Sequence, residues 1–148
     1  FSRIMSLKDG SKKMSKSELS DLSRINLTDK KDSIINKIKK SKTDPLPLPA
    51  SIDELVNRPE AKNLLGIYSS ITNTTLEKSV DEFSGKNFSE FKEKLSQVLI
   101  EKIDPISTEI RRLTEDKSFL DKVLLEGQKK ANDFASNKLK KMQEIVGF

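Results

Sequence analysis

The stretch Lys12-Lys13-Met14-Ser15-Lys16-Ser17 separates a short apolar run, Ile4-Met5-Ser6-Leu7, from a long series of helical patterns. Its lysines and serines make a cationic loop that is rich in hydrogen-bond donors. Ammonium groups neutralise phosphate charge, and hydroxyl and backbone N–H groups bind phosphate oxygens. Composition leaves two interpretations open: a polyphosphate-binding loop, or an ordinary solvated loop, because short basic runs are common.

The segments on either side of this loop are predicted to be extended. Apolar residues dominate the middle of residues 3–7, which we interpret as the end of a buried strand. Residues 18–27 have no regular apolar period, and we expect an irregular return with a short strand at residues 24–27. The chain starts without Met inside an apolar run, so we expect it to be a piece of a longer protein.

The composition excludes several kinds of site. Apolar and charged residues each make up 34% of the 148 residues, which fits helices with one narrow buried stripe. Cys and His are absent, so disulfides, thiolate zinc sites and Ser-His-Asp triads are excluded. We predict no metal-ligating residues, and no membrane partner because no run of 18 apolar residues occurs.

Positive charge is concentrated near the start of the chain. Residues 1–42 hold 12 Lys and Arg against 5 Asp and Glu, whereas residues 43–148 hold 16 against 18. This distribution favours a phosphate site near the N-terminus over a uniformly basic nucleic-acid surface. A smaller basic cluster follows late in the sequence, at Lys129, Lys130, Lys138, Lys140 and Lys141.

Apolar spacing and capping residues predict about five helices after residue 29. Thr28 or Asp29 is expected to cap the first, whose lysines, Lys37 among them, are interpreted as a solvated face. A Pro-Leu-Pro-Leu-Pro connection follows at residues 45–49. The second helix should begin at residues 57–59, with Pro59 near its first position, and bury one face made of Ala61, Leu64, Leu65, Tyr68 and Ile71.

The remaining three helices are predicted from the same signals. Thr74 and Glu77 form a capping box for a short helix that ends near Phe83. Asn87 is expected to cap a long helix with a buried apolar stripe from Phe88 to Leu113, and Pro105 is expected to kink or offset this helix near Ile103. The last helix restarts at residues 114–116, carries an apolar stripe that we expect to be buried, and ends at Gly147.

Several stretches resemble one family closely. Lys13-Met14-Ser15-Lys16-Ser17 has the lysine–methionine–serine–lysine–serine (KMSKS) signature of class I aminoacyl-tRNA synthetases, and Arg3-Ile4-Met5-Ser6-Leu7 is similar to the approach to that loop in the bacterial-type tryptophanyl-tRNA synthetases. The same likeness extends through residues 37–39, 43–44, 63–69, 83–86 and 126–131, and so covers essentially the whole chain.

The resemblance implies a fold and a domain organisation. It makes the chain the C-terminal portion of such an enzyme, mainly α, with a short strand and the KMSKS loop from the edge of a Rossmann-type catalytic domain. Residues 1–29 would be the end of the nucleotide-binding domain. Residues 30–148 would be the helical, anticodon-binding domain, a bundle of about five helices.

The resemblance also implies an activity and its residues. Enzymes of this family activate tryptophan with ATP, release pyrophosphate and transfer the amino acid to its tRNA. Catalytic Lys13 and Lys16 would hold the pyrophosphate moiety, with Ser15 and Ser17 assisting. The main chain of Ile4 would contact adenine, and Met14 belongs to the same ATP-binding set.

The resemblance implies partners and a location as well. Mg²⁺ would be held by the triphosphate, and L-tryptophan by the portion of the enzyme that precedes this chain. The enzyme would bind tryptophan-specific tRNA as a cytoplasmic homodimer, and the sequence does not exclude an organellar form.

The sequence departs from the family pattern in two places and leaves alternatives. Glu18-Leu19-Ser20 replaces the Asp and Pro-Asn that commonly follow the loop, and residues 45–58 differ from the commoner forms. Amino-acid choice lies outside the residues present, so a tyrosine-specific relative remains an alternative. A non-catalytic helical RNA-binding module is the other.

Overall fold

A computed structural model describes residues 3–147 of the chain. Its residues group into two compact units, Phe1–Thr108 and Glu109–Phe148. Five α-helices and one isolated β-bridge occur in the described part, which confirms the prediction of a mainly α fold. In chain order the helical elements are η1 (Asp21–Ser23), α1 (Lys31–Lys39), η2 (Asp53–Asn57), α2 (Pro59–Thr72), α3 (Leu76–Phe83), α4 (Phe88–Glu115) and α5 (Lys117–Val146).

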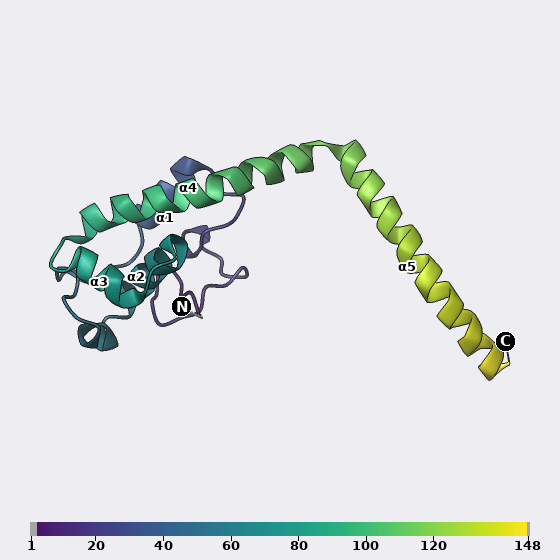
Figure 1. The fold of residues 1–148 in the computed structure, drawn as a ribbon, viewed down its shortest axis with the longest axis horizontal. Coiled ribbons are helices and arrows are strands. Elements are labelled where there is room, and N and C mark those ends of the chain that lie inside the picture. The colour runs from purple at the N-terminus through teal and green to yellow at the C-terminus, as the bar shows by residue number, and fades with distance from the viewer. Residues whose placement is uncertain (1–2, 148) are drawn as a thin grey trace. The chain divides into compact units, whose positions relative to one another are not determined.

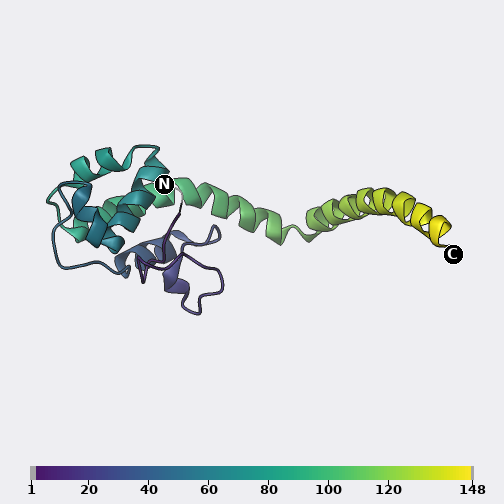
Figure 2. The ribbon, with the colours of Figure 1, turned by 90° about the horizontal axis from the view of Figure 1, so that it is seen from below.

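The core of the first unit is made by α1, α2, α3 and the N-terminal half of α4, which lie together in Figures 1 and 2. An aromatic cluster lies within it. The Tyr68 and Phe83 rings are 4.9 Å apart at 90°, and the Phe83 and Phe91 rings are 4.8 Å apart at 73°. Edge-to-face pairs of this kind add to the free energy gained from burial alone.

Helix α2 is the central element of this unit. It begins at Pro59, where the missing N–H costs no intrahelical bond, and ends at Asn73 in the left-handed conformation. Residues 63–69 are all buried, so most of the middle of this helix is enclosed by other elements. The predicted start and the predicted apolar face of this helix are confirmed.

The N-terminal half of α4 is buried as predicted. The Asn87 side chain accepts a hydrogen bond from the Glu90 N–H at 2.9 Å, and the helix is continuous through Pro105. Four apolar side chains along one face are at most 7% exposed: Phe91, Leu95, Leu99 and Ile103. Their spacing of four residues keeps them on the side that faces the core.

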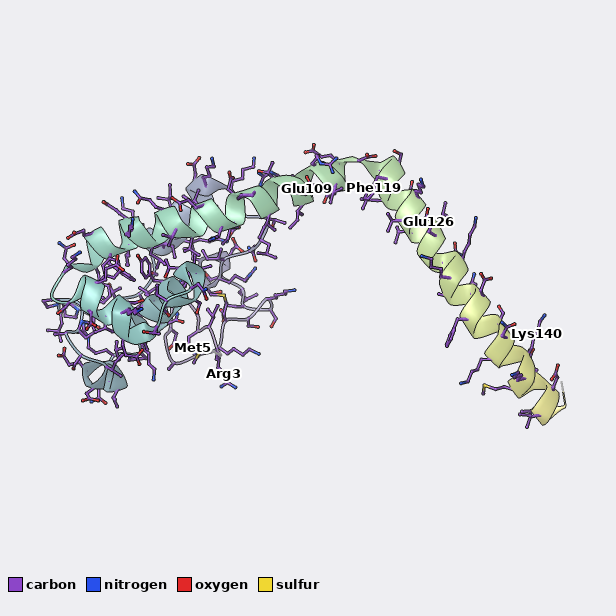
Figure 3. The ribbon with its side chains drawn as sticks, in the orientation of Figure 1. Arg3, Met5, Glu109, Phe119, Glu126 and Lys140 are labelled. Carbon is purple, nitrogen blue, oxygen red and sulfur yellow. The ribbon has the colours of Figure 1, made fainter. Side chains whose placement is uncertain are left out.

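In the second unit, α5 has the predicted ends but not the predicted burial. Asp116 caps it by accepting from the Phe119 N–H, and Gly147 ends it with φ 86°. No residue of the helix is buried, and its side chains stand clear of the ribbon in Figure 3. The prediction of a buried stripe was therefore wrong. An apolar stripe shows which side of a helix is apolar, but burial needs a facing surface.

Two predicted caps were also wrong. Helix α1 begins after Lys30 without a side-chain cap, whereas Asp29 binds a buried lysine instead. A buried ammonium is a stronger partner for a carboxylate than a helix N–H is. Helix α3 is capped by Thr75, which accepts from the Lys78 N–H, and not by Thr74.

Neither of the two predicted strands forms, and a single isolated β-bridge takes the place of the first. Residues 3–7 form only the antiparallel bridge between Met5 and Lys13, and residues 24–27 form no strand. The reason is that side chains take up backbone hydrogen bonds, because Asn63 binds the Met5 backbone and the Asp29 carboxylate accepts from the Asn26 N–H. None of the described helices is long and apolar enough to cross a membrane.

Candidate functional site

The predicted loop extends from a small hairpin at residues 4–14. The Ser6 N–H donates to the Lys12 carbonyl at 2.7 Å, and the Met14 N–H donates to the Ile4 carbonyl at 3.1 Å. In the turn, Ser11 donates through its hydroxyl and its N–H to Asp9 Oδ1. These bonds, led by the hydroxyl, lower the pKa of Asp9. The hairpin thus fixes the point from which the loop leaves.

The loop itself, residues 13–17, is open to solvent. Lys13, Ser15, Lys16 and Ser17 are exposed, and Met14 is half-buried. The Ser15 and Ser17 hydroxyl oxygens are 2.9 Å apart, and the Ser17 N–H donates to Ser15 Oγ. Neither lysine forms an ion pair with any residue in the described part of the chain. Their charges are therefore available to an anion.

A cleft of about 800 Å³ opens beside the loop. Five of the six predicted ATP-binding residues line it, and Ser17 lies next to them in the loop without lining it. The lining combines four cationic side chains, Arg3, Lys13, Lys16 and Arg24, with four apolar ones, Ile4, Met14, Ile25 and Leu27. Such a lining suits a ligand with a flat apolar part and a strongly anionic part.

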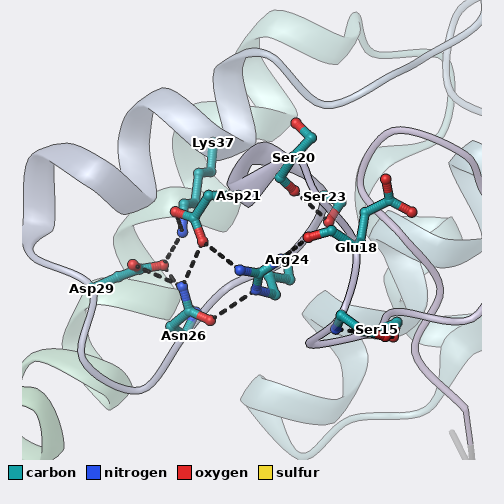
Figure 4. A network of polar contacts seen from close by, with 10 residues as sticks. Ser15, Glu18, Ser20, Asp21, Ser23, Arg24, Asn26, Asp29 and Lys37 are labelled. Atoms are coloured by element: carbon teal, nitrogen blue, oxygen red, sulfur yellow. Dashed lines mark hydrogen bonds and ion pairs between the residues drawn. The ribbon is translucent and has the colours of Figure 1, made fainter.

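Arg24 holds the chain that leaves the loop. Its guanidinium donates to the Glu18 carbonyl at 2.9 Å and to Asn26 Oδ1 at 3.2 Å, and it lies 3.1 Å from Asp21 Oδ1 (Figure 4). A guanidinium presents several donors in one plane, so one side chain can fix three acceptors. Arg24 was not among the predicted site residues, because its role depends on contacts that spacing does not reveal.

A buried lysine anchors this network to α1. Lys37 is 2% exposed, and its Nζ lies 2.6 Å from both Asp21 Oδ2 and Asp29 Oδ2 (Figure 4). The hydrogen bond from Lys37 is the main reason that the pKa of Asp21 is lowered, and Asn26 adds to it. The interpretation of Lys37 as a solvated lysine was wrong, because two carboxylates compensate its burial.

A second residue that sequence reasoning missed is Asn63 of α2. It is 2% exposed and its carboxamide is bonded to the backbone of the hairpin. The one available signal was its position, since an amide inside the apolar series Ala61, Leu64, Leu65 must find partners when buried. No cluster of three or more His, Cys, Asp or Glu in the described residues could hold a metal ion.

The sequence profile of a family described as "tRNA synthetases class I (W and Y)" matches residues 1–104. The chain belongs to this family. The KMSKS-type loop and the cleft beside it lie within the matched part of this class I synthetase chain.

Two similar relatives of this synthetase chain are both tryptophan–tRNA ligases. A tryptophan–tRNA ligase from Mesorhizobium japonicum is 48% identical over 145 residues, which are 98% of this chain and 41% of that protein. A tryptophan–tRNA ligase from Rickettsia felis is 46% identical over 146 residues, 99% of this chain and 44% of that protein. The chain therefore spans about two fifths of the length of these relatives.

Solved structures support the fold of the synthetase chain. Tryptophanyl-tRNA synthetase from Campylobacter jejuni, complexed with ADP and tryptophan, superposes with a TM-score of 0.78 at 21% identity, covering 99% of this chain and 44% of that one. The enzyme from Mycoplasma pneumoniae gives 0.70 at 23% identity with the same coverage. At these identities the likeness concerns the fold.

Proposed function

We propose that this chain is the C-terminal portion of a tryptophan–tRNA ligase and supplies the part of its ATP site that contains the KMSKS-type loop. The observation that supports this most directly is the cleft in which Lys13 and Lys16 face the same space as Ile4 and Met14. The relatives reported above are tryptophan–tRNA ligases, which supports tryptophan as the amino acid. Residues 1–29 would complete the nucleotide-binding domain, and residues 30–148 would form the helical domain.

In this proposal the two lysines act on the departing pyrophosphate. Attack of the tryptophan carboxylate on the α-phosphorus breaks the bond to the β,γ-phosphates, and negative charge grows on the leaving oxygens. Ammonium groups at Lys13 and Lys16 stabilise that charge more than they stabilise the ground state. Ser15 and Ser17 donate further hydrogen bonds, and the Ile4 main chain contacts the adenine.

Mg²⁺ is proposed to enter with ATP. The cleft is lined by lysines, arginines, one serine, one asparagine and apolar side chains, without a carboxylate, and the Asn26 Oδ1 already accepts from Arg24. The described residues around the cleft therefore offer no carboxylate ligand to the ion, and in this proposal the triphosphate would hold it.

Further partners follow from the same proposal. The ligase would bind tryptophan-specific tRNA, take L-tryptophan in the portion that precedes this chain, and function as a homodimer. The five late lysines, Lys129, Lys130, Lys138, Lys140 and Lys141, are exposed on α5 and are proposed contacts for tRNA phosphates.

Pyrophosphate exchange tests the role of the loop. The assay uses a full-length ligase, either the native one or the Mesorhizobium japonicum relative with its aligned segment replaced by this chain. Lys16→Ala should slow tryptophan-dependent exchange by about 10- to 1,000-fold, because a preorganised charge contact is lost, while tryptophan binding stays almost intact.

Lys12→Ala is the matched control. Lys12 lies in the same hairpin, pairs with Asp9 at 3.4 Å and does not line the cleft, so exchange should change less than about twofold. The isolated 148-residue chain should have no exchange activity. Full exchange by Lys16→Ala, or exchange by the isolated chain, would contradict the proposal.

A tyrosine-specific ligase is the second candidate, because the matched family includes both the W and the Y enzymes. The same exchange assay separates them when the native enzyme is given tryptophan or tyrosine. We expect exchange with tryptophan only. Exchange with tyrosine alone would assign the other specificity, and exchange with neither would favour a non-catalytic RNA-binding module.

A further inference from the structure

Asn63, in the second turn of helix α2, bonds this helix to a segment 58 residues earlier in the chain. Its Oδ1 accepts from the Met5 N–H at 2.8 Å, and its Nδ2 donates to the Met5 carbonyl at 2.9 Å and to the Ser6 carbonyl at 3.4 Å. An amide that donates to and accepts from one residue's backbone takes the place of a neighbouring strand.

These bonds complete the hairpin on its outer edge. The Ile4 carbonyl and the Ser6 N–H point inward, to Met14 and Lys12, as alternate backbone groups do in an antiparallel pair. The Met5 N–H and carbonyl therefore point to the opposite side, where Asn63 meets both. Without this side chain, two part-buried backbone groups would have no such partner, which is costly.

A second contact joins the same hairpin to the same helix. Gly10, in the turn, is buried against the start of α2, where an added Cβ would lie 2.6 Å from Glu60 N and Pro59 C. Glu60 is in turn paired with Lys42 at 2.8 Å. The hairpin is thus seated on α2 at two places, about one helical turn apart along the helix.

We propose that Asn63 is a positioning residue for ATP: by holding the Met5 and Ser6 backbone against α2, it sets the place of Ile4 and of the stem of the KMSKS-type loop. This inference rests on the proposed function, because the ligand concerned is ATP. Asn63 does not line the cleft itself and acts through the hairpin.

The connection from Asn63 to the cleft is short. Asn63 fixes Met5, the next residue Ile4 lines the cleft, and the Ile4 carbonyl is bonded to the Met14 N–H, where the loop begins. A displacement of Met5 therefore moves both the proposed adenine contact and the base of the loop. In the proposed ligase, tryptophan binds outside this chain, so its binding should be insensitive to such a displacement.

The test substitutes Asn63→Asp in the full-length ligase described above. The variant keeps the shape and the acceptor oxygen, but it places a carboxylate oxygen where Nδ2 now donates to two carbonyls. We expect kcat/KM for ATP in pyrophosphate exchange to fall about tenfold or more, while KM for tryptophan changes less than about twofold.

Ser70→Ala is the matched control on the same helix. The Ser70 hydroxyl bonds only to the Gly66 carbonyl within α2, so its loss should leave both constants within about twofold. If Asn63→Asp does not fold, Asn63→Gln keeps both polar groups but moves them by one methylene, and the same selective loss for ATP is expected.

The outcomes separate this proposal from the one on which it rests. If the parent enzyme and Lys16→Ala behave as expected but Asn63→Asp saturates normally with ATP, only the positioning role is overturned. An equal loss for ATP and tryptophan, accompanied by a lower Tm, would also overturn it, because Asn63 would then be merely structural. A parent enzyme without tryptophan-dependent exchange would overturn both proposals.

Discussion

Helices α4 and α5 carry similar apolar stripes, yet the structure buries only the N-terminal half of the α4 stripe and none of the α5 stripe. In the first unit, four apolar residues of α4 are almost completely enclosed, and they pack with α1, α2 and α3. In the second unit, α5 is longer and every described residue of it is at least partly open to solvent. Sequence periodicity specifies a helix and its apolar side in both cases, whereas stability comes only where a second surface completes the contact.

The largest expected difference between the two helices is the cost of removing a phenylalanine. Phe91 is 0% exposed in α4, and Phe134 is 80% exposed in α5. Phe91→Ala should lower the free energy of unfolding by about 3–5 kcal/mol, because a buried ring is replaced by a cavity. Phe134→Ala should change it by less than about 0.5 kcal/mol.

Urea unfolding followed by circular dichroism measures both variants of the same chain. A decrease of more than about 2 kcal/mol in the free energy of unfolding of Phe134→Ala would contradict the difference between α4 and α5. It would mean that the apolar face of α5 is covered in solution. Leu95→Ala, at a second enclosed position of α4, should behave like the Phe91 variant with a cost of about 2–5 kcal/mol.

Substituting alanine at two glycines, Gly10 and Gly127, should change the stability by smaller amounts and in opposite directions. At Gly10 a Cβ would meet backbone atoms at 2.6 Å, whereas nothing lies within 4 Å of a Cβ at Gly127 in α5. Gly10→Ala should destabilise the chain by about 1–3 kcal/mol, because backbone atoms of α2 must move. Gly127→Ala should stabilise α5 by up to about 1 kcal/mol through helix propensity.

Thermal unfolding and the helical circular dichroism signal measure the two changes. A lower helical signal in Gly127→Ala would contradict an open helix and indicate that something packs against residue 127. An unchanged Tm in Gly10→Ala would contradict the close contact between the hairpin and the start of α2. This contact is one of the two on which the proposed positioning role of Asn63 depends.

What the sequence could predict depends on whether a residue acts on its own local backbone or on a distant part of the chain. Pro59, Asn87 and Gly147 act on their own local backbone, so the ends of α2, α4 and α5 were predicted correctly. Lys37 and Asn63 act on residues brought near by folding, and nothing in their own neighbourhoods shows those partners.

The residues of the candidate site also fall into these two groups, those with a local sequence signal and those without one. Six loop and strand residues were predicted from a local signature, and the structure brings five of them to one cleft, whereas Ser17 does not line it. Arg24, which holds the far end of the loop through the Glu18 carbonyl, was missed because its partners are set by a folded return segment without a regular pattern.

The smallest expected effect is a shift in the titration of the single tyrosine. Tyr68 is 4% exposed in α2 and donates to Glu82 at 3.0 Å, and α5 contains no tyrosine, so the phenol reports on the packed part alone. Burial, helped by the hydrogen bond to Glu82 and its charge, raises the pKa of Tyr68 from 10.0 to about 12.

Because the folded state holds this proton more tightly than the unfolded state, the associated stability is complete below pH 10 and is lost as the pH rises towards 12. Tyrosinate absorbance should therefore remain low at pH 10.5 in the folded chain and rise at once in urea. In Glu82→Gln the midpoint should move down, because the carboxylate no longer disfavours the phenolate. A Tyr68 titration midpoint at pH 10 in the folded chain would show that the aromatic cluster is open to water. The first unit would then not be more closely packed around Tyr68 than the exposed helix α5.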